Sequence, residues 1–468
     1  MEIEKSAEHT PELSKGLSNR HIQLIAIGGA IGSGLFMGSG KTISLSGSSV
    51  ILTYMLVGFF MFLMMRAVGE ILLSNTSYRS FVDFTSDYLG EWAGFFIGWS
   101  YWLCWLISNI GDVVVIGGYL QFWFPHLSLW IPAVCALFFI VLLNIFTVKS
   151  FGEFEFWFAL IKVVAIVVLI VVGFYMIFTG FTSPKTGVTA SLAHVVEKGS
   201  IFPHGLMGFI AGFQIAVFSF FGIELLGITA GETKDPEKNL PKAINSIPLR
   251  IMLFYVLSLI CIISITSWKY VSPEKSAFVE VFSLAGIQAA AALMNFIVLT
   301  SALSAVNSGV FGTSRMLFGL ACQKDAPHFF EKLSNNKVPL VSLLFSGAGV
   351  LIGVLLLIVI PSVMELYTLL STLCAILIIF VWSLMVVAYL AYRKKRPDLH
   401  LKSIYKMPAG VFFSCACLLF FALVLVFLLF EKDTRVGMYI APFWFVWLAV
   451  AFKYREKING YFVSKFGA

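Results

Sequence analysis

Long apolar runs separated by short polar segments extend along almost the whole chain. Runs such as SSVILTYMLVGFFMFLMM, LWIPAVCALFFIVLLNIF and SLLFSGAGVLIGVLLLIVI have about 20 residues, the length that an α-helix needs to cross the hydrocarbon core of a bilayer. The pattern leaves no room for a soluble domain. It predicts twelve membrane-spanning helices at 20–39, 49–70, 91–123, 129–147, 154–180, 205–230, 246–268, 282–320, 340–360, 363–391, 408–430 and 437–455.

The composition supports an all-α integral membrane protein. Of the 468 residues, 59% are hydrophobic, 16% are aromatic and only 12% are charged, and the mean hydropathy is +0.92. These values lie outside the range of soluble globular domains. We therefore expect every span to be helical, because an isolated segment in lipid must satisfy its own backbone hydrogen bonds.

Positive charge is distributed unevenly between the connections, and this predicts the orientation. Most of the 32 lysine and arginine residues lie in the tails at 1–19 and 456–468 and in the loops that join even spans to odd spans. Cytoplasmic loops carry such an excess, so both termini are expected in the cytoplasm. The same asymmetry explains the net charge of +7, and basic segments beside a membrane suit anionic lipid headgroups. No nucleic-acid partner is therefore inferred.

The cysteine and histidine residues indicate neither a metal site nor a catalytic centre. The seven cysteines lie mostly in apolar runs without zinc-type or disulfide-type spacing, and the seven histidines are scattered. No nucleotide-binding motif accompanies them. We therefore expect no enzyme activity, no metal, no cofactor and no ATP-driven pumping. Repeated polar rings typical of a channel filter are not apparent either.

A glycine-rich stretch, IGGAIGSGLFMGSG, interrupts the first apolar run. It is no dinucleotide fingerprint, because it lacks the strand and the βαβ unit that such a motif requires. Two explanations remain open. The glycines allow close helix packing through their four-residue spacing, or they break the helix in mid-membrane, which leaves backbone N–H and C=O groups free for a ligand.

The sixth span carries a second candidate interruption, in GFIAGFQIAVFSFFGIELLGITAGE. Gly222 and the carboxylate of Glu224 lie near its middle, and an ionisable residue at that depth is a functional hypothesis by default. Broken helices at matched positions in two halves point to a transporter built from inverted repeats. We expect a five-helix repeat at 20–180, an inverted repeat at 205–391, and two further helices within 408–455.

The chemistry of two broken helices selects a ligand with two opposite charges. Free N–H groups near Ser33 and Gly34 favour a carboxylate, because they lie at the positive end of a helix dipole. Free carbonyls favour an ammonium group, and these belong to Ala30, Phe218 and Phe221. An α-amino acid carries both groups, and a β- or γ-amino acid is also compatible.

Several segments then identify a family. The chain resembles the amino acid transporter family of the amino acid–polyamine–organocation superfamily through RHIQLIAIGGAIGSGLFMGSGKTISL, FGEFEFWFALIKVVAIV, FGIELLGITAGETKDPEKNLPKAINSIP and NSGVFGTSRMLFGLA. The resemblance covers nearly the whole chain and implies a five-plus-five inverted-repeat fold and proton-driven uptake across the bacterial inner membrane. The expected partners are a small amino acid, protons and membrane lipids, with no nucleic acid and no nucleotide.

The substrate is also suggested by resemblance. The segments MGSGKTISL, ETKDPEKNLPKAINSIPLRI and LKSIYKMP are similar to those of bacterial members that import glycine, D-alanine and D-serine. A permease for another amino acid, either an aromatic one, γ-aminobutyrate or an L-amino acid, is the alternative, as is an amino acid exchanger.

Family roles carry over to individual positions of this sequence. The resemblance implies that Gly32, Ser33 and Gly34 hold the substrate carboxylate, that the carbonyls of Ala30, Phe218 and Phe221 hold the ammonium group, and that Phe218 covers the site as a gate. Ser33 stands where many relatives have threonine, which keeps the hydroxyl group.

Polar residues of spans three and eight are further candidates to line the substrate pathway. They are Tyr101 and Asn109 on span three, and Ser304 and Asn307 on span eight. Asn109, Ser304 and Asn307 are equally compatible with interhelical hydrogen bonds. Asp112 shares a helical face with Asn109 and is either a pathway carboxylate or a partner of a neighbouring span.

Two buried ionisable groups are candidates for proton coupling, Glu224 and Lys162. Desolvation penalises the charged form of such a group, so its protonation depends on the access of water. In relatives with the same Ile–Lys step, the amine lies beside the unwound part of span one, where sodium binds in sodium-driven members. The alternative for Lys162 is a permanent ion pair with Asp112 or Glu153.

Overall fold

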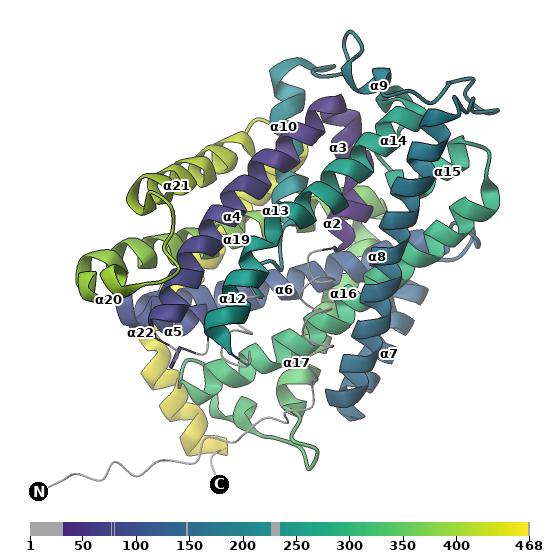
Figure 1. The fold of residues 1–468 in the computed structure, drawn as a ribbon. Helices are drawn as coiled ribbons and strands as arrows, with labels where there is room; N and C mark the ends of the chain where they lie inside the picture. Colours follow the sequence, from purple (N-terminus) through teal and green to yellow (C-terminus); the bar gives the residue numbers. More distant parts are fainter. Residues whose placement is uncertain (1–30, 76, 79, 147, 226–234, 467–468) are drawn as a thin grey trace, which may run out of the picture.

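The computed structural model describes residues 31–466 except 76, 79, 147 and 226–234. Throughout this part of the chain the regular structure is helical, apart from one isolated antiparallel bridge between Thr182 and Thr189. The helices form one bundle in which long helices cross at steep angles (Figure 1). The predicted all-α class is confirmed for the described residues.

Within these residues, nine helices are long and apolar enough to span a membrane. They comprise α3 with η1 and α4 (Gly38–Ser46, Gly47–Ser49, Val50–Ser74), α6 (Glu91–Leu120), the Glu155–Phe178 part of α8 (Val148–Phe178), α12 to α14 with η3 (Pro236–Asn245, Ile247–Arg250, Ile251–Leu257, Ser258–Thr266), α16 (Gln288–Cys322), α17 with α18 (Leu340–Val354, Leu356–Val359), α19 (Val363–Lys395), α21 (Gly410–Phe427) and the Lys432–Lys457 part of α22 (Lys432–Phe466).

Shorter helices complete the bundle. Two of them, α7 and α10, are apolar, and the others lie beside or between the long helices. Their bounds are Ser33–Phe36 (α2), Phe81–Leu89 (α5), Trp130–Phe146 (α7), Ala193–Val196 (α9), Gly205–Ser219 (α10), Ala277–Leu284 (α15) and Pro397–Lys402 (α20).

Helix α6 lies at the centre of the bundle. It packs along α16 and α19, while α10 packs on α3 and α19, and α8 packs on α16 and α14. The core between these helices is rich in aromatic side chains; Tyr101, Tyr367 and Trp382 are almost completely buried there. Residues distant in sequence, on α2, α6, α8, α10, α16 and α19, are thereby brought around one central region (Figure 1).

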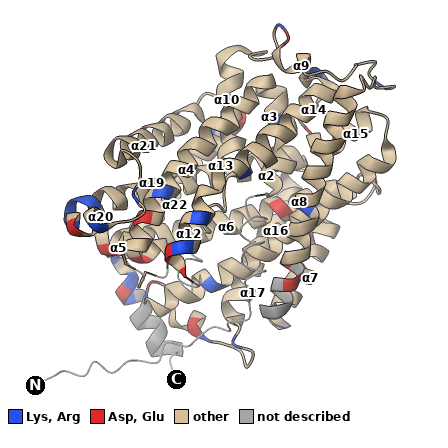
Figure 2. Cartoon of the chain, viewed as in Figure 1, with Lys and Arg blue, Asp and Glu red and all other residues tan. Residues whose placement is uncertain are grey.

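The outer faces of the bundle are apolar. On α8, Val164, Val168, Val171 and Phe178 expose between 49% and 82% of their surface. A continuous exposed apolar face of this kind marks a membrane-facing surface. Charged residues instead gather around α5, α12 and α20, and the middle parts of most helices carry none (Figure 2). This distribution places the long helices within the bilayer and the multi-pass chain in a membrane.

The first predicted span ends later than the hydropathy indicated. Helix α3 continues to Ser46 instead of ending at 39, although GKTISLS is polar. The structure shows why this polarity is tolerated. The Lys41 ammonium lies 2.5 Å from Asp433 and 3.2 Å from the Thr368 hydroxyl, and the Thr42 hydroxyl donates to the Gly38 carbonyl. Hydropathy cannot detect polar groups that find partners on other helices.

Other predicted boundaries also shift. The eighth span begins at Gln288 rather than 282, because Gly286 adopts a left-handed conformation (φ 81°) that separates α15 from α16. The last span, predicted to end at 455, continues helically to Phe466, so the predicted cytosolic tail at 456–468 is largely helical.

Candidate functional site

Helix α2 begins abruptly in the middle of the bundle. Its N-cap, Gly32, has an extended backbone, and no side chain caps the helix. The first helical hydrogen bonds run from Phe36 N to the Gly32 carbonyl (3.3 Å) and from Met37 N to the Ser33 carbonyl (2.7 Å). The N–H groups of Ser33, Gly34 and Leu35 therefore precede these bonds, as at any helix start. Ala30, the predicted ammonium ligand, lies outside the described residues.

Helix α10 ends at Ser219, and turns follow over Phe220–Glu224. Gly222 has a φ of 98°, a conformation that residues with a side chain rarely adopt. The Phe218 carbonyl accepts the Phe221 N–H at 3.0 Å, and Leu225 N donates to the Gly222 carbonyl at 3.1 Å. The Phe218 carbonyl is therefore engaged within the turn.

The start of α2 and the end of α10 are in direct contact. A Cβ atom at Gly34 would lie 2.7 Å from Ser219 Cα and 2.8 Å from Ser219 Oγ. Ser219 is itself held in place, because its Oγ lies 3.1 Å from the Tyr54 hydroxyl and its carbonyl accepts from the Tyr255 hydroxyl at 2.9 Å. Only glycine permits this approach of the two backbones. The glycine-rich stretch therefore provides close packing at the same point where α2 begins.

Polar side chains gather beside Ser33. The Tyr367 hydroxyl donates to Ser33 Oγ at 3.2 Å, and the Asp112 carboxylate interacts with Ser33 and electrostatically with Lys162. Asp112 is 3% exposed, and its Oδ1 has no hydrogen-bond partner within the described residues. Tyr367 also packs edge-on against Phe218, with ring centroids 5.9 Å apart. Tyr367 was missed by sequence analysis, because a tyrosine within MELYTLLSTLCA looks like an ordinary interfacial or core residue.

Glu224 is fully buried and holds the turn after α10 to two other helices. Its Oε1 accepts from the Tyr101 hydroxyl (2.9 Å) and from the Gly222 N–H (3.1 Å), and its Oε2 accepts from Trp382 Nε1 (3.2 Å). Predicted residues Tyr101, Gly222 and Glu224 therefore lie together. Trp382 on α19 was missed, since nothing in the sequence shows that its indole N–H faces a carboxylate.

Aromatic rings surround this turn. Phe221 lies 4.5 Å from Trp105 and 6.2 Å from Tyr101 between ring centroids, and it stacks on Phe218 at 6.3 Å. All four side chains are at most 8% exposed. The rings of Phe218 and Phe221 thus pack together beside the turn after α10, and Trp105 of α6 contacts Phe221.

Lys162 links three parts of the bundle. Its Nζ donates to the Ile31 carbonyl and to Ser304 Oγ, both at 3.2 Å. Ser304 Oγ donates in turn to Glu155 Oε1 at 2.8 Å. The lysine is 1% exposed, and the Ile31 carbonyl that it contacts belongs to the residue before Gly32. Ser304 contacts this amine in the described structure, and Glu155 was not singled out from the sequence.

The two predicted asparagines differ in their contacts. Asn307 Oδ1 accepts from Asn144 Nδ2 at 3.0 Å, which is an interhelical hydrogen bond between α16 and α7. Asn109 packs tightly against Gly309 of α16, where a Cβ atom would lie 1.8 Å from Asn109 Oδ1. Neither polar atom of the Asn109 amide has a partner within the described residues. A buried amide without a partner is costly; Asn307 Nδ2 also has no partner within the described residues, so Asn109 differs from Asn307 in lacking a partner on both of its polar atoms.

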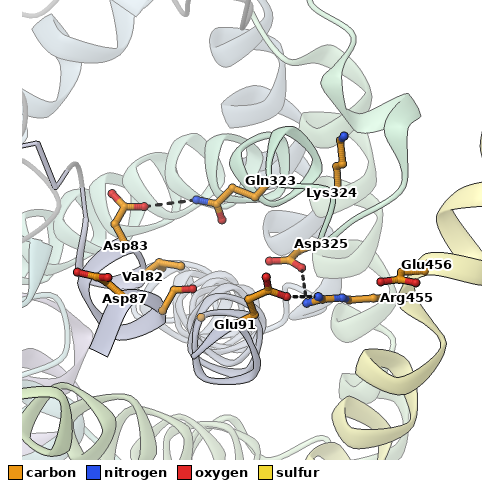
Figure 3. Close-up of a pocket in the computed structure, with 11 residues that line it drawn as sticks. Val82, Asp83, Asp87, Glu91, Gln323, Lys324, Asp325, Arg455 and Glu456 are labelled. Carbon is orange, nitrogen blue, oxygen red and sulfur yellow. Dashed lines mark hydrogen bonds and ion pairs between the residues drawn. The ribbon is translucent and has the colours of Figure 1, made fainter. Parts of the chain in front are cut away.

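A cavity of about 760 Å³ lies elsewhere, between α5, the start of α6, the segment after α16, and α22 (Figure 3). Arg455 on α22 forms ion pairs there with Glu91 and Asp325, and burial raises the pKa of Asp325 to about 6. Glu91 begins α6, whereas Asp112 lies 21 positions further along it, which is roughly 30 Å at the rise of an α-helix. The cavity is therefore remote from Ser33, and its acidic side chains carry no evidence of a ligand.

Comparison with known proteins identifies the family of this chain. The family model described as "Amino acid permease" matches residues 21–460. The chain belongs to the amino acid permease family. This family belongs to the amino acid–polyamine–organocation superfamily. Some of its members are highly identical in sequence to this chain.

Three relatives illustrate this range. The D-serine/D-alanine/glycine transporter of Escherichia coli (strain K12) is 58% identical over 445 residues, which cover 95% of this chain and 94% of the relative. The amino-acid permease AapA of Bacillus subtilis (strain 168) is 47% identical over 446 residues, 95% of this chain and 96% of the relative. The probable threonine/serine transporter YbxG of the same strain is 38% identical over 441 residues, 94% of this chain and 95% of the relative.

Proposed function

We propose that this permease imports glycine, D-alanine and D-serine across the bacterial inner membrane by proton-coupled secondary transport. The observation that carries the proposal is the contact between the start of α2 at Ser33 and the end of α10 at Ser219. It brings the N-terminal N–H groups of one helix beside the turn that follows another. The 58% identity with transporters named for these substrates supports the choice of amino acids.

The proposed architecture has twelve spans in a five-plus-five inverted repeat followed by two helices. Spans one and six are discontinuous in this scheme, and the helix start at Ser33 and the turns over Phe220–Glu224 support it. Both termini face the cytoplasm, because the basic connections lie on their side of the membrane. The clustering of charge around α5, α12 and α20 supports the same orientation (Figure 2).

In the proposed substrate pose, the backbone N–H groups of Gly32, Ser33 and Gly34 bind the carboxylate. The carbonyls of Ala30, Phe218 and Phe221 bind the ammonium group. In this pose the rings of Phe218, Phe221 and Tyr367 lie beside the substrate side chain and limit it to a small group such as a hydrogen atom, a methyl group or a hydroxymethyl group.

Lys162 and Glu224 couple transport to protons in this proposal. Lys162 bridges the Ile31 carbonyl, next to Gly32, and Ser304 of α16, so its charge state affects the geometry of span one. Glu224 holds the turn after α10 to Tyr101 and Trp382, so its charge state affects span six. The protonation of two groups is thereby linked to both broken helices.

Uptake of labelled glycine into proteoliposomes under an imposed inward proton gradient tests the proposal. D-Alanine and D-serine in large excess are expected to reduce the uptake of labelled glycine strongly, because they compete for the same site. Aromatic and cationic amino acids should have little effect. Strong competition by the latter would reject the proposed substrates, and counterflow without gradient-driven accumulation would establish an exchanger.

A Glu224→Gln substitution is expected to retain counterflow exchange of glycine but to lose the pH dependence of uptake. Glutamine cannot change its charge, and its Oε1 still accepts from Tyr101 and Gly222. Its Nε2 would face the Trp382 indole N–H, two donors that repel, so exchange should slow. The measurement is uptake against external pH, compared with counterflow.

The double variant Glu224→Gln/Trp382→Phe removes that repulsion and is the matched control. If exchange recovers while pH dependence stays lost, the carboxyl group acts by titration. Unaltered pH-driven accumulation in Glu224→Gln would assign Glu224 a structural role.

A further inference from the structure

Glu155 is a buried carboxylate for which substrate binding provides no role. It begins the membrane-spanning part of α8, is 1% exposed, and faces the centre of the bundle. Its Oε1 accepts from Ser304 Oγ at 2.8 Å, whereas its Oε2 has no hydrogen-bond partner within the described residues. Burying a carboxylate oxygen without a partner is costly, which suggests that this group does more than support packing.

The carboxylate and the Lys162 ammonium are joined through one hydroxyl group. Lys162 Nζ donates to Ser304 Oγ at 3.2 Å, and Ser304 Oγ donates to Glu155 Oε1 at 2.8 Å. Both steps have donor and acceptor in the orientation that a proton transfer requires. Lys162 and Glu155 are seven residues apart on α8, about two helical turns, and the carboxylate also interacts electrostatically with the Lys162 ammonium. Ser304 of α16 provides the hydrogen-bonded connection between them.

Other polar groups lie around this hydrogen-bonded chain in the described part of the structure. Asp112 of α6 lies on the side of Lys162 towards Ser33 and interacts with it electrostatically. Asn144 of α7 and Asn307 of α16 bond to each other one helical turn beyond Ser304. Further along α16, Arg315 lies over the Phe311 ring and donates to the Phe311 carbonyl at 3.1 Å, and Glu153 on α8 has contacts of its own.

We propose that Glu155 accepts a proton from Lys162 and that this transfer carries the proton towards the cytoplasm. Lys162 Nζ gives one proton to Ser304 Oγ while the Ser304 hydroxyl proton passes to Glu155 Oε1. The products are a neutral amine, an unchanged serine hydroxyl and a neutral carboxylic acid, so protons and charge balance. The inference rests on the proposed proton-coupled function.

The direction of this transfer follows from the topology. Glu155 lies two helical turns nearer than Lys162 to the connection between α7 and α8, which joins an even span to an odd span. That side is cytoplasmic in the proposed orientation. Glu155 is closed to water in this structure, so release of the proton requires opening of the bundle on that side. A deprotonated Lys162 then no longer holds the Ile31 carbonyl with a charge.

Glu155→Gln in the full-length permease tests the relay in proteoliposomes. Glutamine keeps the size of the side chain and an oxygen for Ser304 but cannot accept a proton. We expect accumulation of labelled glycine under a proton gradient to fall at least about tenfold, equal to ~1.4 kcal/mol. Counterflow of glycine at equal pH should stay near the wild-type rate, and glycine-dependent proton uptake, followed with an internal pH dye, should be lost.

The variants Ser304→Thr and Ser304→Ala extend the test to the bridging hydroxyl. Threonine keeps the hydroxyl and should keep more proton uptake per glycine than alanine does. Wild-type accumulation in Glu155→Gln would overturn the relay, and so would loss of counterflow together with accumulation, because a structural role predicts that loss. The wild-type protein separates the relay from the proposed proton coupling. If wild-type protein does not accumulate glycine under a proton gradient, proton coupling itself is rejected.

Discussion

A Gly34→Val substitution is expected to abolish glycine uptake, with a loss of at least about a hundredfold in apparent affinity or rate. Any Cβ atom at position 34 would lie 2.7 Å from Ser219 Cα, a backbone atom that cannot rotate away. Forced overpacking of this kind costs about 1–3 kcal/mol, and the branched side chain also covers the N–H groups proposed to bind the carboxylate. Glycine binding to purified protein and uptake into proteoliposomes measure the effect.

Two other glycines serve as controls for this variant. At Gly38, a Cβ atom would meet the side chain of Ile215, which lies on α10 as Ser219 does. At Gly312 on α16, a Cβ atom would meet no atom within 4 Å. We expect Gly312→Ala to behave as wild type. Gly38→Ala should lower thermal stability while glycine affinity is retained.

The comparison between positions 34 and 38 decides between the two explanations of the glycine-rich stretch. Equal behaviour of Gly34→Ala and Gly38→Ala, with normal glycine affinity in both, would show that the glycines serve helix packing alone. Selective loss of affinity at position 34 would support the carboxylate site at the start of α2.

A Lys162→Ala substitution is expected to stop gradient-driven accumulation of glycine almost completely. Alanine removes the amine that bridges the Ile31 carbonyl and Ser304 Oγ, and it leaves Glu155 without its proton donor. The geometry of span one then no longer depends on the protonation of residue 162. The measurement is accumulation of labelled glycine under an imposed pH gradient, with binding of glycine followed separately on the purified protein.

The exposed Lys185 in the loop after α8 provides the matched control, because Lys185→Ala removes a lysine without touching the bundle. It should accumulate glycine as wild type does. Accumulation at the wild-type level in Lys162→Ala would rule out its coupling role. Loss of glycine binding in addition to accumulation would show that the amine is required to form the site.

Features that depend on one residue or one segment could be predicted from the sequence. Runs of about 20 apolar residues indicate membrane helices whatever their neighbours are, and the family follows from motifs along the whole chain. Gly34, Lys162 and Glu224 stood out because glycine clusters and charges are conspicuous in an apolar background. The depth of a residue in the membrane can be estimated from its position within a span. For these three residues, that depth was sufficient to select them as candidates.

Helix ends and partners could not be predicted in the same way. Lys41 looks too polar for a span, yet Asp433 and Thr368 compensate for it. Glu155 was not singled out from the sequence, yet it is buried against Ser304. A hydropathy pattern indicates which segment crosses the membrane and how deep a residue lies in it. It contains no information on the direction in which the side chain points.

The sequence by itself thus determined an all-helical membrane protein of a known family, and it indicated the segments in which we propose the substrate site. Only the tertiary structure decided which groups meet, as Tyr367 with Ser33, Trp382 with Glu224 and Ser219 with Gly34 do. The physical reason is that burial in lipid is a local property of each segment. Contacts between helices depend on the side chains of both partners, and these partners are separated by more than a hundred residues of chain.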